Sequence, residues 1–83
     1  MQPLPPHARL TLSAKERAVC DLLITGATNE DIAATLSAQG THVATRTVKA
    51  TLNRAFWRNQ IVSGVKRVKL AVYYFREKQG WKT

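Results

Sequence analysis

The stretch of sequence that decides the fold runs from Leu12 to Gly26 and reads LSAKERAVCDLLITG. Ser13 and Glu16 have the Ser-x-x-Glu spacing of a capping box, in which each side chain binds a backbone N–H group at the start of a helix. Apolar residues follow at helical spacing, namely Val19, Cys20, Leu22 and Leu23. Gly26 is a typical helix stop. The stretch therefore predicts a helix over about residues 14–25.

A weaker start signal follows directly. Thr28 is a good N-cap residue, and Glu30 and Asp31 favour the positive end of the helix dipole. The inner face of this helix is Ile32, Ala33 and Leu36. Gly40 ends it in a left-handed cap, which predicts a helix over about residues 29–39. Residues 41–44 have no predicted shape, because their β-branched side chains also suit a short extended segment.

The helical period returns at Thr45 and lasts to Arg58 or Gln60. The predicted inner face is Val48, Leu52, Ala55 and Phe56. The opposite face is polar and basic, and consists of Arg46, Lys49, Ala50, Asn53 and Arg54. Trp57 lies near this outer face, and we expect it to pack against the next helix rather than to stack on a base.

Ser63 and Gly64 break the pattern, and a last helix is predicted over about residues 65–79. Its expected inner face is Val65, Val68, Ala71, Val72 and Phe75. A second apolar strip, expected on the outside, is Leu70, Tyr73 and Tyr74. Apolar residues grouped on an outer face are unusual for a monomer, so this strip predicts a homodimer. Isolated surface aromatic residues are the alternative.

The 83 residues form one small all-α domain with a strong positive charge. We divide the chain into a Pro-rich tail (1–10), a helical domain (11–80) and a C-terminal tail (81–83). The chain has 13 Lys or Arg and 5 Asp or Glu, a formal net charge of +8. Residues 46–83 hold ten of the basic residues and a single carboxylate. This concentration predicts a polyanion partner, with a merely solvated basic face as the plainer alternative.

Several classes of function are excluded by what the sequence lacks. Cys20 is the only cysteine, so no disulfide within the chain and no thiolate metal site can form, and we expect it in the core. His7 and His42 have no partner at ligand spacing, so we expect no metal, no cofactor and no enzyme activity. There is no signal-like start and no apolar run of about 20 residues, which favours a cytoplasmic location away from membranes.

Two short capped helices followed by a third with a basic outer face predict a helix-turn-helix, whose third helix enters the DNA major groove. The sequence also resembles the LuxR/GerE-type DNA-binding domain over about residues 12–76. Residues 12–26 resemble its opening helix and residues 27–36 its second helix. The stretch Thr45-Arg46-Thr47-Val48-Lys49 resembles the Thr-Val-Lys signature of that family, and Gly64-Val65 with Ala71-Val72 resembles its turn and fourth helix.

The resemblance implies a four-helix transcription regulator of a bacterium or phage that binds double-stranded DNA, usually as a dimer through the last helix. It implies that Thr47 and Lys49 contact DNA and that Val48 seats the helix on the core. The chain departs from the family in a connection about five residues longer, within residues 37–44. It also has Ala44 where the family has a capping serine. The third helix therefore lacks its usual N-cap, unless Thr41 or Thr45 provides one.

We therefore expect a stand-alone DNA-binding regulator. The predicted DNA contacts are Arg46, Thr47, Lys49, Ala50, Asn53, Arg54, Arg58, Lys66, Arg67 and Lys69. The last three lie at the start of the final helix and would contact phosphates, which positions the protein on the DNA. A run of solvated charges explains these three residues equally well. The alternative function is a small helical module that binds an acidic protein surface, such as a subunit of RNA polymerase or an anti-repressor.

Overall fold

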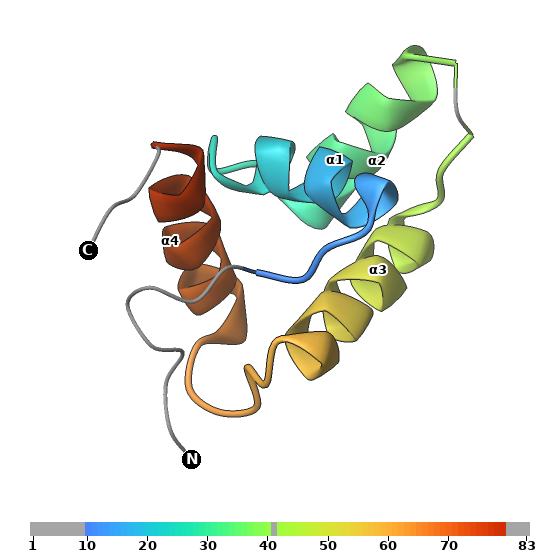
Figure 1. Cartoon of the computed structure of the whole chain (residues 1–83). Coiled ribbons are helices and arrows are strands. Elements are labelled where there is room, and N and C mark those ends of the chain that lie inside the picture. Colours follow the sequence, from blue (N-terminus) through green and yellow to red (C-terminus); the bar gives the residue numbers. More distant parts are fainter. Residues whose placement is uncertain (1–9, 41, 80–83) are drawn as a thin grey trace.

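The computed structural model describes residues 10–40 and 42–79 (Figure 1). Its helices are α1 (Ala14–Leu23), α2 (Asn29–Ala38), α3 (Thr45–Arg58) and α4 (Lys66–Lys78). The described ranges contain no strand, so the predicted all-α class is confirmed, and each helix starts within one residue of its predicted position. None of the helices in these ranges has the length and apolar character that crossing a membrane requires.

The two capped helices form as the sequence predicts. The Ser13 hydroxyl accepts from the Glu16 backbone N–H at 3.1 Å, and the Ser13 N–H donates to the Glu16 carboxylate at 2.8 Å. At α2, Thr28 and Asp31 form the same pair of bonds, so a second complete capping box starts this helix. The predicted stops are confirmed too, since Gly26 and Gly40 follow α1 and α2 with φ of +89° and +98°.

The core lies where α1 and α2 pack on one side of α3, with α4 on the other side of α1 (Figure 1). The largest fully buried side chains come from all four helices and are Ile32, Leu70, Val19, Val48 and Cys20. Burial raises the pKa of the Cys20 thiol to about 12, which keeps it protonated at neutral pH. The prediction that Cys20 is a core residue is confirmed.

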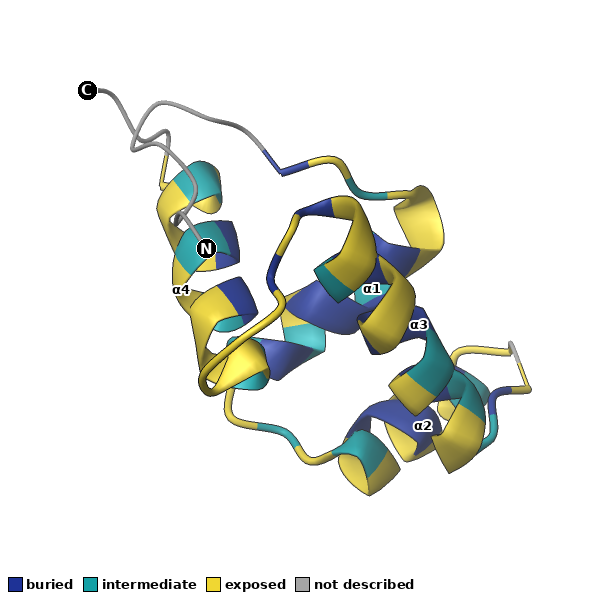
Figure 2. Cartoon of the chain, turned by 90° about the horizontal axis from the view of Figure 1, so that it is seen from below, coloured by how far each residue is buried: buried dark blue, intermediate teal, exposed yellow. Residues whose placement is uncertain are grey.

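The predicted faces of α4 are wrong. Leu70 is fully buried and Tyr74 is 3% exposed, so neither can belong to a strip on the outside. Tyr73 is half-buried against the core. The residues expected inside are instead largely exposed, namely Val65, Val68, Val72 and Phe75, whereas Ala71 is half-buried. Figure 2 shows the exposed side of α4 turned away from the other helices.

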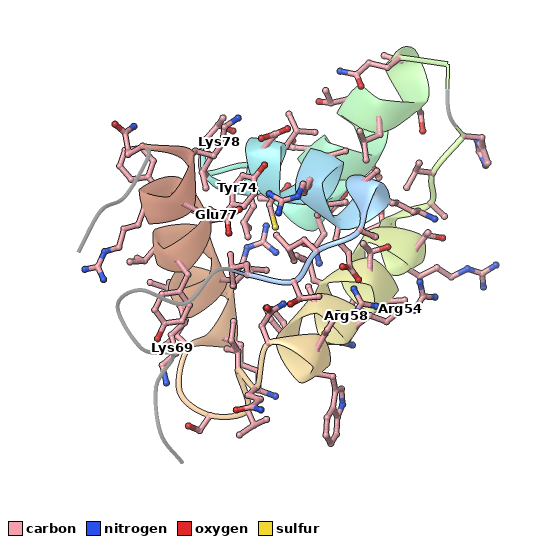
Figure 3. The ribbon with its side chains drawn as sticks, in the orientation of Figure 1. Arg54, Arg58, Lys69, Tyr74, Glu77 and Lys78 are labelled. Carbon is pink, nitrogen blue, oxygen red and sulfur yellow. The ribbon has the colours of Figure 1, made fainter. Side chains whose placement is uncertain are left out.

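Polar contacts set this rotation of α4. Arg67, Leu70, Tyr74 and Glu77 are three or four residues apart and share one side of the helix. The Tyr74 hydroxyl donates to the Asp21 carboxylate on α1 at 2.7 Å, and Lys78 pairs with the same oxygen at 2.9 Å. Figure 3 shows Tyr74, Glu77 and Lys78 on the side of α4 that faces α1. Burial, followed by the bond to Asp21, raises the pKa of Tyr74 to about 12.

The segment before α1 is bound to the ends of α3 and α4. The Leu10 N–H donates to the Glu77 carboxylate at 2.9 Å, and Glu77 also pairs with Arg17 at 2.7 Å. Thr11 exchanges two hydrogen bonds with the buried Asn59 side chain, at 2.7 and 3.0 Å. Leu10, which we expected to end the tail, is therefore a core residue. The rest of the predicted tail, residues 1–9, and the tail over residues 81–83 lie outside the described residues.

The ion pair between Arg58 and Glu16 ties the end of α3 to the start of α1. Glu16 is only 3% exposed, and the same carboxylate oxygen also accepts the capping bond from Ser13. A carboxylate withdrawn from water in this way needs its partners, because an unpaired buried charge is costly.

We expect Arg58→Met to lower the free energy of unfolding by about 1–3 kcal/mol, because it leaves the Glu16 carboxylate with only its single capping bond from the Ser13 N–H. Arg54→Met is the matched control on the same helix, since Arg54 is exposed, and should change stability by less than about 0.5 kcal/mol. Urea denaturation followed by circular dichroism measures both variants. Equal losses in the two would contradict a stabilising role for the ion pair.

The hydrogen bond from Tyr74 lowers the pKa of Asp21, with a further contribution from Lys78. A lowered carboxyl pKa stabilises the fold above the unfolded pKa, and this stabilisation is lost as pH falls through the folded value. Tyr74→Phe should therefore cost about 0.5–1.5 kcal/mol at neutral pH, and the difference from the wild type should shrink below about pH 4. Unfolding curves of both proteins between neutral and acidic pH test this. A difference that stays constant into acid would contradict it.

Candidate nucleic-acid interface

The outer face of α3 is exposed as predicted. Arg46, Lys49, Asn53 and Arg54 are exposed, whereas Thr47 and Ala50 are half-buried beside them. The opposite side of the helix is locked in the core by Val48, Leu52 and Ala55. In Figure 1, α3 runs along one edge of the molecule, so nothing among the described helices covers its outer side.

The cations on this face have no acidic neighbour on their own helix or on the connection that follows it. The sequence contains no carboxylate between Asp31 and Glu77. The ion pairs within the described ranges use Arg17, Arg58 and Lys78, and not Arg46, Lys49 or Arg54. Unneutralised like charges along one helix create a local positive potential, which attracts an anionic partner.

The start of α3 has no side-chain cap among the described residues. Its N-cap residue is Ala44, and no side chain caps the helix, so Thr45 does not provide the cap. Thr41, the other candidate, lies outside the described residues. The first turn of α3 lies at the positive end of the helix dipole, next to Arg46 and Lys49.

The connection before α3 is held by Ser37. Its hydroxyl accepts from the Val43 N–H at 3.1 Å and donates to the Val43 carbonyl at 3.2 Å. Val43 is buried in the core. The shape of this connection was not predicted, and Ser37 was missed, because a serine late in a helix gives no sign of which distant backbone it will bind.

Two of the predicted DNA contacts, Arg58 and Arg67, also make contacts within the framework. Arg58 is paired with the buried Glu16, so its charge is already neutralised within the fold. Arg67 donates to the Asn29 side chain and to the Ala27 carbonyl, the latter at 2.6 Å, and so joins α4 to the start of α2. These internal contacts were not predicted, because the partners are remote in the sequence.

The two lysines at the start of α4 are exposed but lie in different places. Lys66 lines the same hollow as Asn53 and Trp57, so it borders the outer face of α3. Lys69 lies over Gly64, where an added Cβ would come within 3.1 Å of its Nζ. Figure 3 shows Lys69 on the α4 side of the molecule, across from Arg54. The structure thus places Lys66, and not Lys69, beside the outer face of α3.

Trp57 does not pack against α4, contrary to prediction. Its side chain is 78% exposed, the largest exposed aromatic surface among the described residues. The turn after α3 explains this. Gln60 adopts a left-handed conformation with φ of +60°, and the Ile61 N–H donates to the Phe56 carbonyl at 2.8 Å. Ile61 and Phe56 therefore fill the inner side of the turn, and the indole stays outside.

The exposed apolar residues of α4 and its N-cap form a stripe, which we call the α4 stripe: Val65, Val68, Val72 and Phe75. They are three or four residues apart and so share one side of the helix. A hollow beside the stripe is lined by Leu23 and Ile24 at the end of α1 and by Val72 and Phe75. The side of α4 that is exposed for self-association is therefore opposite to the side predicted from the sequence.

The described residues contain no cluster of His, Cys, Asp and Glu that could hold a metal ion. Neither protein-family models nor curated proteins nor solved structures gave a match to this chain. The function is therefore proposed from the residues of the site alone.

Proposed function

We propose that this chain binds double-stranded DNA by placing the outer face of α3 in the major groove. The observation that carries the proposal is the set of exposed cations Arg46, Lys49 and Arg54 around Asn53, on a helix without a carboxylate. A polyanion with a regular groove matches both the charge and the shape of this face.

The dimensions support the fit. The 14 residues of α3 make a helix about 21 Å long, and the groove, about 12 Å wide, admits one helix with its side chains. Within the face, the cations bind phosphates and position the helix, while Asn53 has the amide that pairs with adenine and Ala50 has a methyl group that fits against thymine. Thr47 adds a hydroxyl at the edge of the groove, and Lys66 a further phosphate contact.

We further propose that the domain is of LuxR/GerE type and regulates transcription. The order of four helices, the capped α1 and the position of the basic α3 support this assignment. The long connection before α3 and the uncapped Ala44 are two of the features in which this chain differs from the family pattern.

The functional unit that we propose is a homodimer formed through the α4 stripe. Four large apolar side chains on one helix face lose unfavourable contact with water when two copies pack stripe to stripe. The stripe is turned away from the other helices (Figure 2), so pairing through it leaves both α3 faces free. Two copies of α3 would then read two half-sites of an inverted repeat.

DNA binding is tested by selection from random duplexes of about 30 base pairs near physiological ionic strength, about 0.15 M salt. We expect retention, an enriched inverted repeat, and a log–log salt slope that grows by about 0.9 for each phosphate contact. Retention without enrichment would indicate binding to the backbone alone. Absence of retention would overturn the proposal and favour the alternative, an acidic protein surface.

Two variants are compared in this assay. Lys49→Ala tests the interface, and Lys15→Ala on α1 is the matched exposed control. We expect Lys49→Ala to weaken binding to the enriched site by about 1–3 kcal/mol, whereas Lys15→Ala should leave the affinity unchanged. An unchanged affinity of Lys49→Ala at fixed salt would remove Lys49 from the interface.

The dimer is tested by sedimentation at micromolar concentration, with and without DNA. Val68→Glu places a charge in the α4 stripe and should raise the dimer dissociation constant by about tenfold or more. Val62→Glu is the control, because Val62 is exposed to a similar degree outside the stripe. A monomeric mass for the wild type under both conditions would overturn the dimer, whatever the variants do.

A further inference from the structure

We propose that Trp57 is a DNA contact of this domain, and that its indole packs against the apolar surface of the duplex at the end of the α3 face. The inference depends on the proposed function, because it extends the same face by one helical turn. It names a residue that neither charge nor the family resemblance selects.

The position of Trp57 on α3 is the first argument. Arg46, Ala50, Asn53 and Trp57 are spaced by four, three and four residues, so they form one line along the helix. Trp57 lies about 16 Å beyond Arg46 along the axis, which is three turns. A helix that lies in the groove with Arg46 and Asn53 against the DNA therefore also brings the indole to the duplex.

The surroundings of the indole are the second argument. Trp57 lines a hollow of about 400 Å³ together with Asn53 and Lys66. It also lines a second hollow with Asn53, Arg54 and Arg58, and of these two arginines Arg58 already pairs with Glu16. An exposed aromatic ring among cations and an amide suits a partner with apolar patches between anionic groups. Deoxyribose rings and thymine methyl groups between phosphates have this chemistry.

Charge decides against a second copy of the chain as the occupant. Pairing two molecules through Trp57 would bring Arg54 and Lys66 of one copy against the same cations of the other. Like charges in an interface oppose association. The apolar surface suited to self-association is the α4 stripe, whose helix face Figure 2 shows directed away from the remaining helices.

The test uses Trp81→Phe, which leaves Trp57 as the only tryptophan of the chain. Trp81 lies outside the described residues. The ligand is the most abundant duplex of the bound pool from the selection above. Acrylamide quenching of Trp57 fluorescence should fall about twofold or more when this duplex is saturating, because the indole is then covered.

Affinity provides the second measurement. Trp57→Ala should weaken binding about fivefold or more. It should leave the log–log salt slope unchanged, because the indole carries no charge, whereas Lys66→Gln should reduce the slope by about 0.9. Circular dichroism should show equal stability for Trp57→Ala and the wild type, since the side chain is exposed. A duplex with deoxyuridine in place of thymidine separates a methyl contact, which it weakens, from a deoxyribose contact, which it does not.

The outcomes separate the two proposals. If labelled duplex binds while the indole stays equally quenchable, and Trp57→Ala binds within about twofold of the wild type, Trp57 is not a contact and DNA binding stands. If no duplex binds to the wild type or to Trp81→Phe, both proposals are overturned. Protection of the indole together with the loss of affinity supports both.

Discussion

The fold depends on how five carboxylates are distributed among thirteen Lys and Arg side chains. Four of them make contacts within the folded domain, namely Glu16, Asp21, Asp31 and Glu77. Their hydrogen bonds start α1 and α2, and join α1 to α4 and to the end of α3. Because they lie on α1, α2 and the last turns of α4, the outer face of α3 keeps its positive charge. The placement of the acids thus stabilises the domain and leaves one basic surface open.

Local signals were enough to predict the helices. The capping boxes need only residues three apart, and glycine stops act on the residues beside them, so sequence alone contains the whole interaction. The outer face of α3 was also predictable, since Val48, Leu52 and Ala55 are apolar and their opposite neighbours are polar. A single apolar face at helical spacing then determines which side of the helix turns toward the core.

The rotation of α4 was not predictable in this way, because apolar residues lie on two sides of it. Polar contacts select which side of α4 faces the core. Arg67 and Glu77 lie on the same side as Leu70 and Tyr74, and they bind groups on other elements. Such partners are remote in sequence, so their effect cannot be seen in a helical period. The same reason separates Arg58, which meets Glu16, from Arg54, which does not.

The contacts of the segment before α1 have a consequence for how the domain folds during synthesis. The bond between Leu10 and Glu77 spans 67 residues, and that between Thr11 and Asn59 spans 48. Contacts between residues so far apart in the sequence form late, because closing the loop between them costs conformational entropy before the contact can stabilise the fold. On the ribosome, the capping residues of α1 and α2 emerge early, yet the Leu10 N–H cannot reach its acceptor until Glu77 has left the exit tunnel. The final closure of the domain therefore waits for the last turns of α4, and until then its apolar core stays open to chaperones.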